Sequence, residues 1–210
     1  MDRHSFRDTV EAAKATELSR LGSNKLLVAV TAAELDERSV LTAAAHSEHA
    51  ARETFRAWAA EEEDEGARAA FERVADQEAE HLDRVLDAAD GDIDLVDGGP
   101  MHAYLRGREG TVERLAAGLV GRGLVVVRTH TQIISFFVNE ADERRADLFR
   151  DLKSETVAEI DAGVDLLAER CSDDADWERA AAAAEYVIQV AYDDYVDGLT
   201  ELGIDPKPVC

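Results

Sequence analysis

We expect an all-α fold from three features of the 210-residue sequence. Only three prolines occur, at positions 100, 206 and 208, so residues 1–99 and 101–205 lack the strongest helix breaker. Apolar residues recur at spacings of three and four, which is the period of an amphipathic helix, and nothing in the pattern suggests strands. With 46% apolar residues, a chain of this length can bury a hydrophobic core without disulfides or a structural metal.

In the first half of the chain, the apolar period predicts three helices. The first is weakened midway by Gly22, Ser23 and Asn24, and the acidic run from Glu61 to Glu65 makes the turn between the second and the third. A long irregular segment follows at 90–100, about the length of a crossover between helix pairs. The three helices are expected at about residues 6–30, 39–60 and 66–89.

The second half should also form three helices. One of them contains GLVVVRTHTQIISFFV at 123–138, which is apolar almost all round and should lie at the centre of a bundle. The last should begin at about Asp176, as a cap, and end at Gly203. The expected helices cover about residues 111–138, 146–171 and 176–202. We therefore expect one helical domain over 1–203, with a bundle core at about 39–171, and an irregular tail at 204–210.

The net charge of the chain limits the kinds of partner that it can bind. There are 46 acidic against 23 basic residues, for a net charge of −23. Such a surface is typical of a halophilic archaeon, because the Debye length falls to ~3 Å in molar salt and self-repulsion is screened. No basic stripe exists to neutralise phosphates, which argues against direct nucleic-acid binding. No apolar run is long enough for a membrane span, and the N-terminus has no secretory core, so we expect a cytoplasmic protein without a membrane partner.

The strongest local motif is Glu78-x-x-His81. Residues three apart on a helix point to the same side, so a carboxylate and an imidazole can reach one metal ion. Both residues fall on the apolar stripe of their helix, as Glu48 does on the preceding one. A buried carboxylate without a charge partner costs several kcal/mol or stays protonated. A charge partner, a metal ion or protonation must therefore offset the cost of burying the carboxyl groups of Glu48 and Glu78.

The segments SEHAARETFRAWA and ARAAFERVADQEAEHLDRV resemble the first helix pair of the ferritin-like superfamily, in its rubrerythrin-like branch. The resemblance covers residues 39–89 well and extends faintly to about 171. It implies a ferritin-like four-helix bundle core, to which the first and last helices would be N- and C-terminal additions. By that resemblance Glu48 matches the lone Glu of the first bundle helix, and Glu78 with His81 matches the ExxH of the second.

The second half departs from the family motif. His130 stands where the third bundle helix has Glu, and the fourth-helix ExxH reads Thr156-x-x-Glu159. Glu155 is a candidate substitute for the lost ligand. The candidate metal ligands are thus three carboxylates and two imidazoles, a mix suited to iron or manganese at one or two sites: Glu48, Glu78, His81, His130 and Glu159.

The resemblance implies metal handling, with peroxide-reducing or ferroxidase activity. Full rubrerythrins carry a rubredoxin module, whose iron site needs CxxC pairs. The only cysteines here, Cys171 and Cys210, are too far apart in the sequence to form such a pair. The alternative is a non-catalytic ferritin-like scaffold, for example a transcription-associated regulatory protein, which binds an unidentified protein partner through the added helices. That reading expects Glu48 and Glu78 to pair with Arg or His81 or to reach solvent, and it expects His130 to bond a backbone carbonyl. An apolar face left on an outer helix would favour a homodimer.

Overall fold

A computed structural model describes residues 3–206 of the chain, so Cys210 and most of the expected tail lie outside the described residues. The described part is all-helical and has no strand, which confirms the predicted all-α class. The elements in chain order are α1 (Arg3–Ala13), α2 (Ala15–Leu21), α3 (Lys25–Val30), α4 (Glu37–Glu61), α5 (Glu65–Ala88), α6 (Pro100–Arg106), α7 (Thr111–Arg114), the π-helical segment η1 (Leu115–Gly121), α8 (Arg122–Asn139), α9 (Glu143–Arg170) and α10 (Asp174–Glu201).

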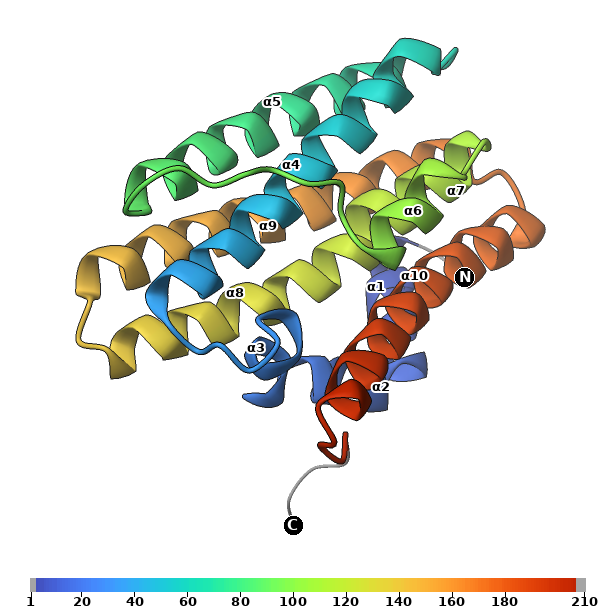
Figure 1. Ribbon diagram of the computed structural model, residues 1–210. Coiled ribbons are helices and arrows are strands. Elements are labelled where there is room, and N and C mark those ends of the chain that lie inside the picture. The colour runs from blue at the N-terminus through green and yellow to red at the C-terminus, as the bar shows by residue number, and fades with distance from the viewer. Residues whose placement is uncertain (1–2, 207–210) are drawn as a thin grey trace.

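Four long helices form a bundle, as Figure 1 shows. Helix α4 packs along α5, and α8 packs along α9, so each half of the sequence supplies one helix pair. Helix α10 crosses the bundle on the side of η1 and α8, together with the short helices α1 to α3. The helix pairs and the outer position of the terminal segments agree with the sequence analysis.

Aspartate side chains cap four of the long helices at their N-termini. Asp36 accepts a hydrogen bond from the Ser39 amide at the start of α4, and Asp64 accepts one from the Ala67 amide at the start of α5. Asp142 caps α9 in the same way. A side-chain oxygen at this position satisfies a backbone N–H that the helix leaves open.

Two sequence-based helix boundaries were wrong, and one short helix was not predicted. The cap of α10 is Asp173, which accepts a hydrogen bond from the Asp176 amide, so Asp176 lies in the first turn. The expected helix at 6–30 is broken into α1, α2 and α3, with breaks near Lys14 and Gly22. The irregular crossover gives way at Pro100 to helix α6, because proline is well tolerated in the first turn of a helix.

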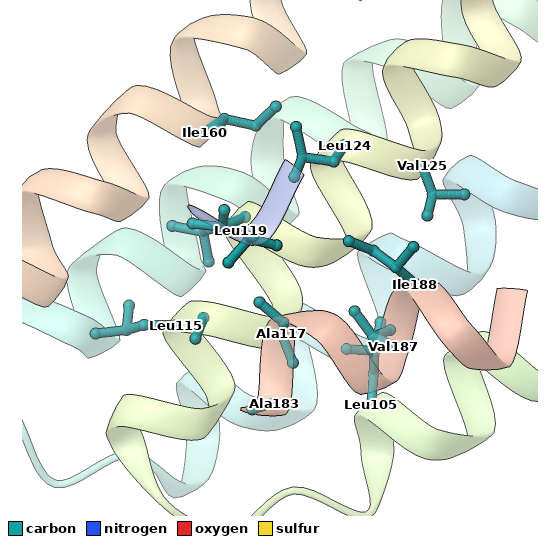
Figure 2. Close-up of a cluster of buried hydrophobic side chains, with 14 of the residues drawn as sticks. Leu105, Leu115, Ala117, Leu119, Leu124, Val125, Ile160, Ala183, Val187 and Ile188 are labelled. Carbon is teal, nitrogen blue, oxygen red and sulfur yellow. The ribbon is translucent and has the colours of Figure 1, made fainter. Parts of the chain in front are cut away.

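The helix from Thr111 to Asn139 runs on through α7, η1 and α8, and its middle is very closely packed. A Cβ atom on Gly121 would lie 2.3 Å from Val187 Cγ1, and one on Gly123 would lie 2.6 Å from Ile160 Cγ1. Glycine at these positions lets α10 and α9 approach the backbone from two sides. Figure 2 shows the resulting apolar cluster, which includes Leu119, Ile160 and Val187.

The core consists of two apolar clusters with a polar layer between them. One cluster contains Phe55 and Phe71, and the other contains Leu41 and Phe149. Along both α4 and α5, buried polar residues occur between the stretches that enter the two clusters. Among the described residues, no helix is long and apolar enough to cross a membrane.

Candidate metal centre

Four helices contribute side chains to the polar layer. Helix α4 supplies Glu48 and α5 supplies Glu78 and His81, and these three side chains are each 1% exposed. Helix α8 supplies Arg122 and His130, and α9 supplies Glu159. The five residues expected from the sequence therefore lie in one buried layer, and the structure adds Arg122.

Five buried atoms in this layer have no hydrogen-bond partner while the carboxyl groups are ionised, and two of them are Arg122 Nη1 and His130 Nδ1. When one of the two carboxyl groups is protonated, Glu48 and Glu78 share a side-chain hydrogen bond. The other three unpartnered atoms lie close together. They are Glu48 Oε2, Glu78 Oε2 and His81 Nδ1. His81 Nδ1 lies 3.9 Å from Glu48 Oε2 and 3.8 Å from Glu78 Oε2, which is too far for a hydrogen bond. The three residues can offer one ligand atom each, all within 4.8 Å of one another.

These separations fit a single ion. Two ligands that each lie ~2.1 Å from one metal ion are at most about 4.2 Å apart. The distances from His81 Nδ1 to the two carboxylate oxygens are below that limit. His81 Nδ1 thus lies at single-ion distance from each carboxylate, within a group whose ligand atoms are all within 4.8 Å of one another.

Each of the three side chains has a second polar atom, and that atom contacts a neighbouring side chain. Glu155 Oε2 lies 2.6 Å from His81 Nε2, and a hydrogen on Nε2 leaves the Nδ1 lone pair free for a metal. His130 Nε2 lies 3.2 Å from Glu48 Oε1, and Arg122 Nη2 donates to Glu78 Oε1 at 2.7 Å. Each candidate ligand is therefore fixed on one side and open on the other.

Arg122 is the residue that the sequence analysis did not single out. It is completely buried, and its Nη2 also donates to Glu159 Oε1 at 2.8 Å. Its Nε donates to the Gly118 carbonyl, and the guanidinium lies over the Phe55 ring. The available signal was an arginine between two glycines, two helical turns before His130, at the start of a long apolar run.

His130 and Glu159 belong to the layer without being part of the group of three. His130 contacts Glu48, and its Nδ1 has no hydrogen-bond partner. Glu159 binds Arg122 and accepts a longer hydrogen bond from Gln77. Thr156, at the position where the ExxH motif would have Glu, donates its hydroxyl to the Leu152 carbonyl in its own helix. Glu155 approaches the site as the partner of His81.

Burial changes the protonation of the carboxyl groups. Burial raises the pKa of Glu78 to about 8 and that of Glu159 to about 7, and it also raises the pKa of Glu48. The pKa of His130 is lowered to about 4 by burial and by the nearby Arg122 charge. Burial by itself lowers the pKa of Arg122, but the negative charges of Glu78 and Glu159 have a larger effect, so the pKa of the guanidinium is raised. Arg122 is therefore a permanent cation in the layer.

Comparisons of the chain with protein-family models, with curated proteins and with solved structures gave no match. The case for a function is therefore made from the geometry and charge of the polar layer.

Proposed function

We propose that this protein binds one divalent transition-metal ion, iron or manganese, through Glu48, Glu78 and His81. The observation that carries the proposal is the set of three unpartnered atoms, Glu48 Oε2, Glu78 Oε2 and His81 Nδ1. Buried polar atoms almost always have a partner, and here three of them face the same point. A metal ion would satisfy all three at once.

The net charge of the polar layer supports the binding of one divalent ion. Ionised Glu48, Glu78 and Glu159 carry three negative charges, and Arg122 carries one positive charge. A divalent cation would balance the remaining two charges with both histidines neutral. Without it, the layer must keep carboxyl groups protonated, because unpaired buried charges are costly.

Carboxylate and imidazole ligands suit iron and manganese. Three protein ligands leave coordination positions for water or a small substrate, as in catalytic metal sites. The resemblance to rubrerythrin-like proteins supports peroxide reduction or oxidation of ferrous iron as the chemistry that a bound iron ion would supply. Arg122 and His130 would hold the two carboxylates in place during such a reaction.

Metal stoichiometry tests the proposal. The full chain, prepared in molar KCl without a histidine tag, is titrated anaerobically with Fe²⁺ and separately with Mn²⁺, and bound metal is measured by mass spectrometry. We expect one ion per chain, lost in Glu48→Gln and in Glu78→Gln. Glu80→Gln, on the exposed side of the same helix α5, is the matched control and should keep the ion. Absence of binding, or unchanged stoichiometry in both site variants, contradicts the proposal.

The second candidate function is a scaffold whose bundle is held together by an ion pair in place of a metal. Its supporting observation is the contact of Arg122 with Glu78, which the scaffold reading expected, and with Glu159. The same reading expected His130 to bond a backbone carbonyl, but His130 contacts Glu48 instead. The same titration separates the two functions, because the scaffold binds no ion. Peroxide consumption by the iron-loaded chain, compared with Glu78→Gln, then tests the redox activity.

A further inference from the structure

A cavity of about 380 Å³ lies outside the polar layer, where the outer elements α3, α6 and α10 cover the bundle helices α4 and α8. Its volume falls within the range of roughly 300–1,000 Å³ that is common for small-molecule sites. Its wall is mostly apolar, and the lining residues include Leu27 of α3, Val40 of α4 and Ile133 of α8. The cavity can therefore take up an alkyl chain.

The cavity opens to solvent at its exposed lining residues. Among the described residues that line it, Val30, Gly99 and Asp194 are exposed. Gly99 and Asp194 lie next to each other across two elements, because a Cβ atom on Gly99 would lie 3.4 Å from Asp194 Oδ2. A carboxylate oxygen thus lies at the mouth of the cavity, where a ligand from solution can reach it.

The carboxylate of Asp194 has no countercharge. No lysine or arginine is among the described residues that line the cavity, and no described residue forms an ion pair or hydrogen bond with the Asp194 side chain. Burial raises the pKa of Asp194, and the negative charges of Asp197 and Glu201 on the same helix raise it further. A cation at Asp194 Oδ2 would offset this repulsion, whereas an anionic ligand would add to it.

We propose that this cavity binds an alkylammonium ion, with the alkyl chain along the apolar wall and the ammonium group at Asp194. An ammonium group has a positive charge and three hydrogen-bond donors, and a carboxylate without a partner can accept them. The charged group stays at the mouth in contact with water, so binding avoids the cost of burying an ion, while the alkyl chain leaves water. The cavity is separate from the polar layer, and binding there needs no metal ion.

The test compares octylammonium, 1-octanol and octanoate, which have the same number of carbon atoms and differ in the charge of the head group. Binding to the intact chain in molar KCl is measured by calorimetry. We expect saturable binding of one octylammonium ion per chain, about fivefold tighter than that of 1-octanol, with octanoate the weakest ligand. Octanoate that binds as tightly as octylammonium would overturn the proposal. So would octylammonium that binds no more tightly than 1-octanol.

A matched pair of charge variants tests the role of Asp194. Asp194→Asn should bind octylammonium about fivefold less tightly and 1-octanol with unchanged affinity, because only the charge is lost. Asp193→Asn is the control, since Asp193 is exposed on the same helix and already accepts a hydrogen bond from Gln189. Equal losses in the two variants would show attraction to the acidic surface as a whole and would overturn the assignment to Asp194.

A second pair of variants tests the position of the alkyl chain. Ala191→Phe places a ring in the cavity wall and should abolish binding of octylammonium and 1-octanol. Ala182→Phe, on the exposed face of the same helix α10, should leave both affinities unchanged. Binding that survives in Ala191→Phe would overturn the proposal. If Ala191→Phe does not fold, the comparison of Asp194→Asn with Asp193→Asn still decides.

Discussion

Arg122 Nη2 donates a 2.7 Å hydrogen bond to Glu78 Oε1, and neither side chain is more than 1% exposed. The second oxygen of the same carboxylate, Oε2, has no hydrogen-bond partner and lies 3.8 Å from His81 Nδ1. One carboxylate thus joins an internal ion pair to a candidate metal site.

Replacing Arg122 should strongly destabilise the metal-free protein. Arg122→Met leaves Glu78 and Glu159 buried without their cation, and breaking a buried pair in this way costs about 3–5 kcal/mol of unfolding free energy. Urea unfolding in molar KCl measures the change. Arg150→Met is the control, because the ion pairs of Arg150 with Asp147 and Glu143 are exposed and should matter little. Similar small changes in both variants would contradict the central role of Arg122.

Glu155 should tune the metal site without binding the ion. Glu155→Gln weakens the contact that orients His81, so we expect metal affinity to fall about 10- to 100-fold with stoichiometry unchanged. Competition titration with Mn²⁺ measures the affinity. Asp151→Asn is the control, since Asp151 contacts Arg84 in the same cluster and does not contact His81. Equal effects of the two substitutions would show that only the general surface charge matters.

His102 should make the protein less stable in acid. Its pKa is about 3 in the folded chain, against about 6.5 in an unfolded one, because the buried imidazole stays neutral. Between these values the unfolded chain binds a proton that the native chain does not, so this contribution to stability falls as pH falls. The slope is at most ~1.4 kcal/mol per pH unit.

The comparison with His102→Leu isolates that slope. Unfolding free energies of both proteins are measured from pH 7.5 down to pH 5, and the stability of the parent relative to the variant should fall below pH 6.5. The comparison is needed because the pKa values of Glu78 and Glu159 are raised in the folded chain. These two carboxyl groups therefore increase the unfolding free energy as pH falls, and they do so in both proteins. Parallel curves would refute the contribution of His102.

Gly121 should not tolerate a side chain. In Gly121→Ala, the new Cβ would lie 2.3 Å from Val187 Cγ1 and 2.7 Å from the Ala184 carbonyl oxygen, and we expect a loss of about 1–3 kcal/mol. Thermal unfolding measures it. Gly107→Ala is the control, because its nearest contact would be an ordinary 3.4 Å from the Tyr104 carbonyl oxygen. A neutral Gly121→Ala would mean that α10 can move away from η1.

Much of the fold could be predicted from the pattern of apolar residues. The period of three and four gave the long helices of the bundle, and their pairing in two halves is confirmed. The motif Glu78-x-x-His81 put two residues on one helix face, and the resemblance to a ferritin-like helix pair added Glu48. The structure brings these three of the five predicted ligands together. The weak point at Gly22 was visible in the sequence, and the chain breaks there. The apolar period did not predict the break near Lys14 or helix α6, because short helices depend on the surfaces against which they pack.

The sequence by itself determined which residues point inward, since a helix fixes the face on which residues three and four apart lie. Only the tertiary structure decided how their charges are balanced. Arg122 is buried because Gly121 and Gly123 let α10 and α9 close around it, and its partners Glu78 and Glu159 come from helices distant in the sequence. An ion pair or a metal site needs groups within a few ångströms, and only the packing of separate helices brings them that close.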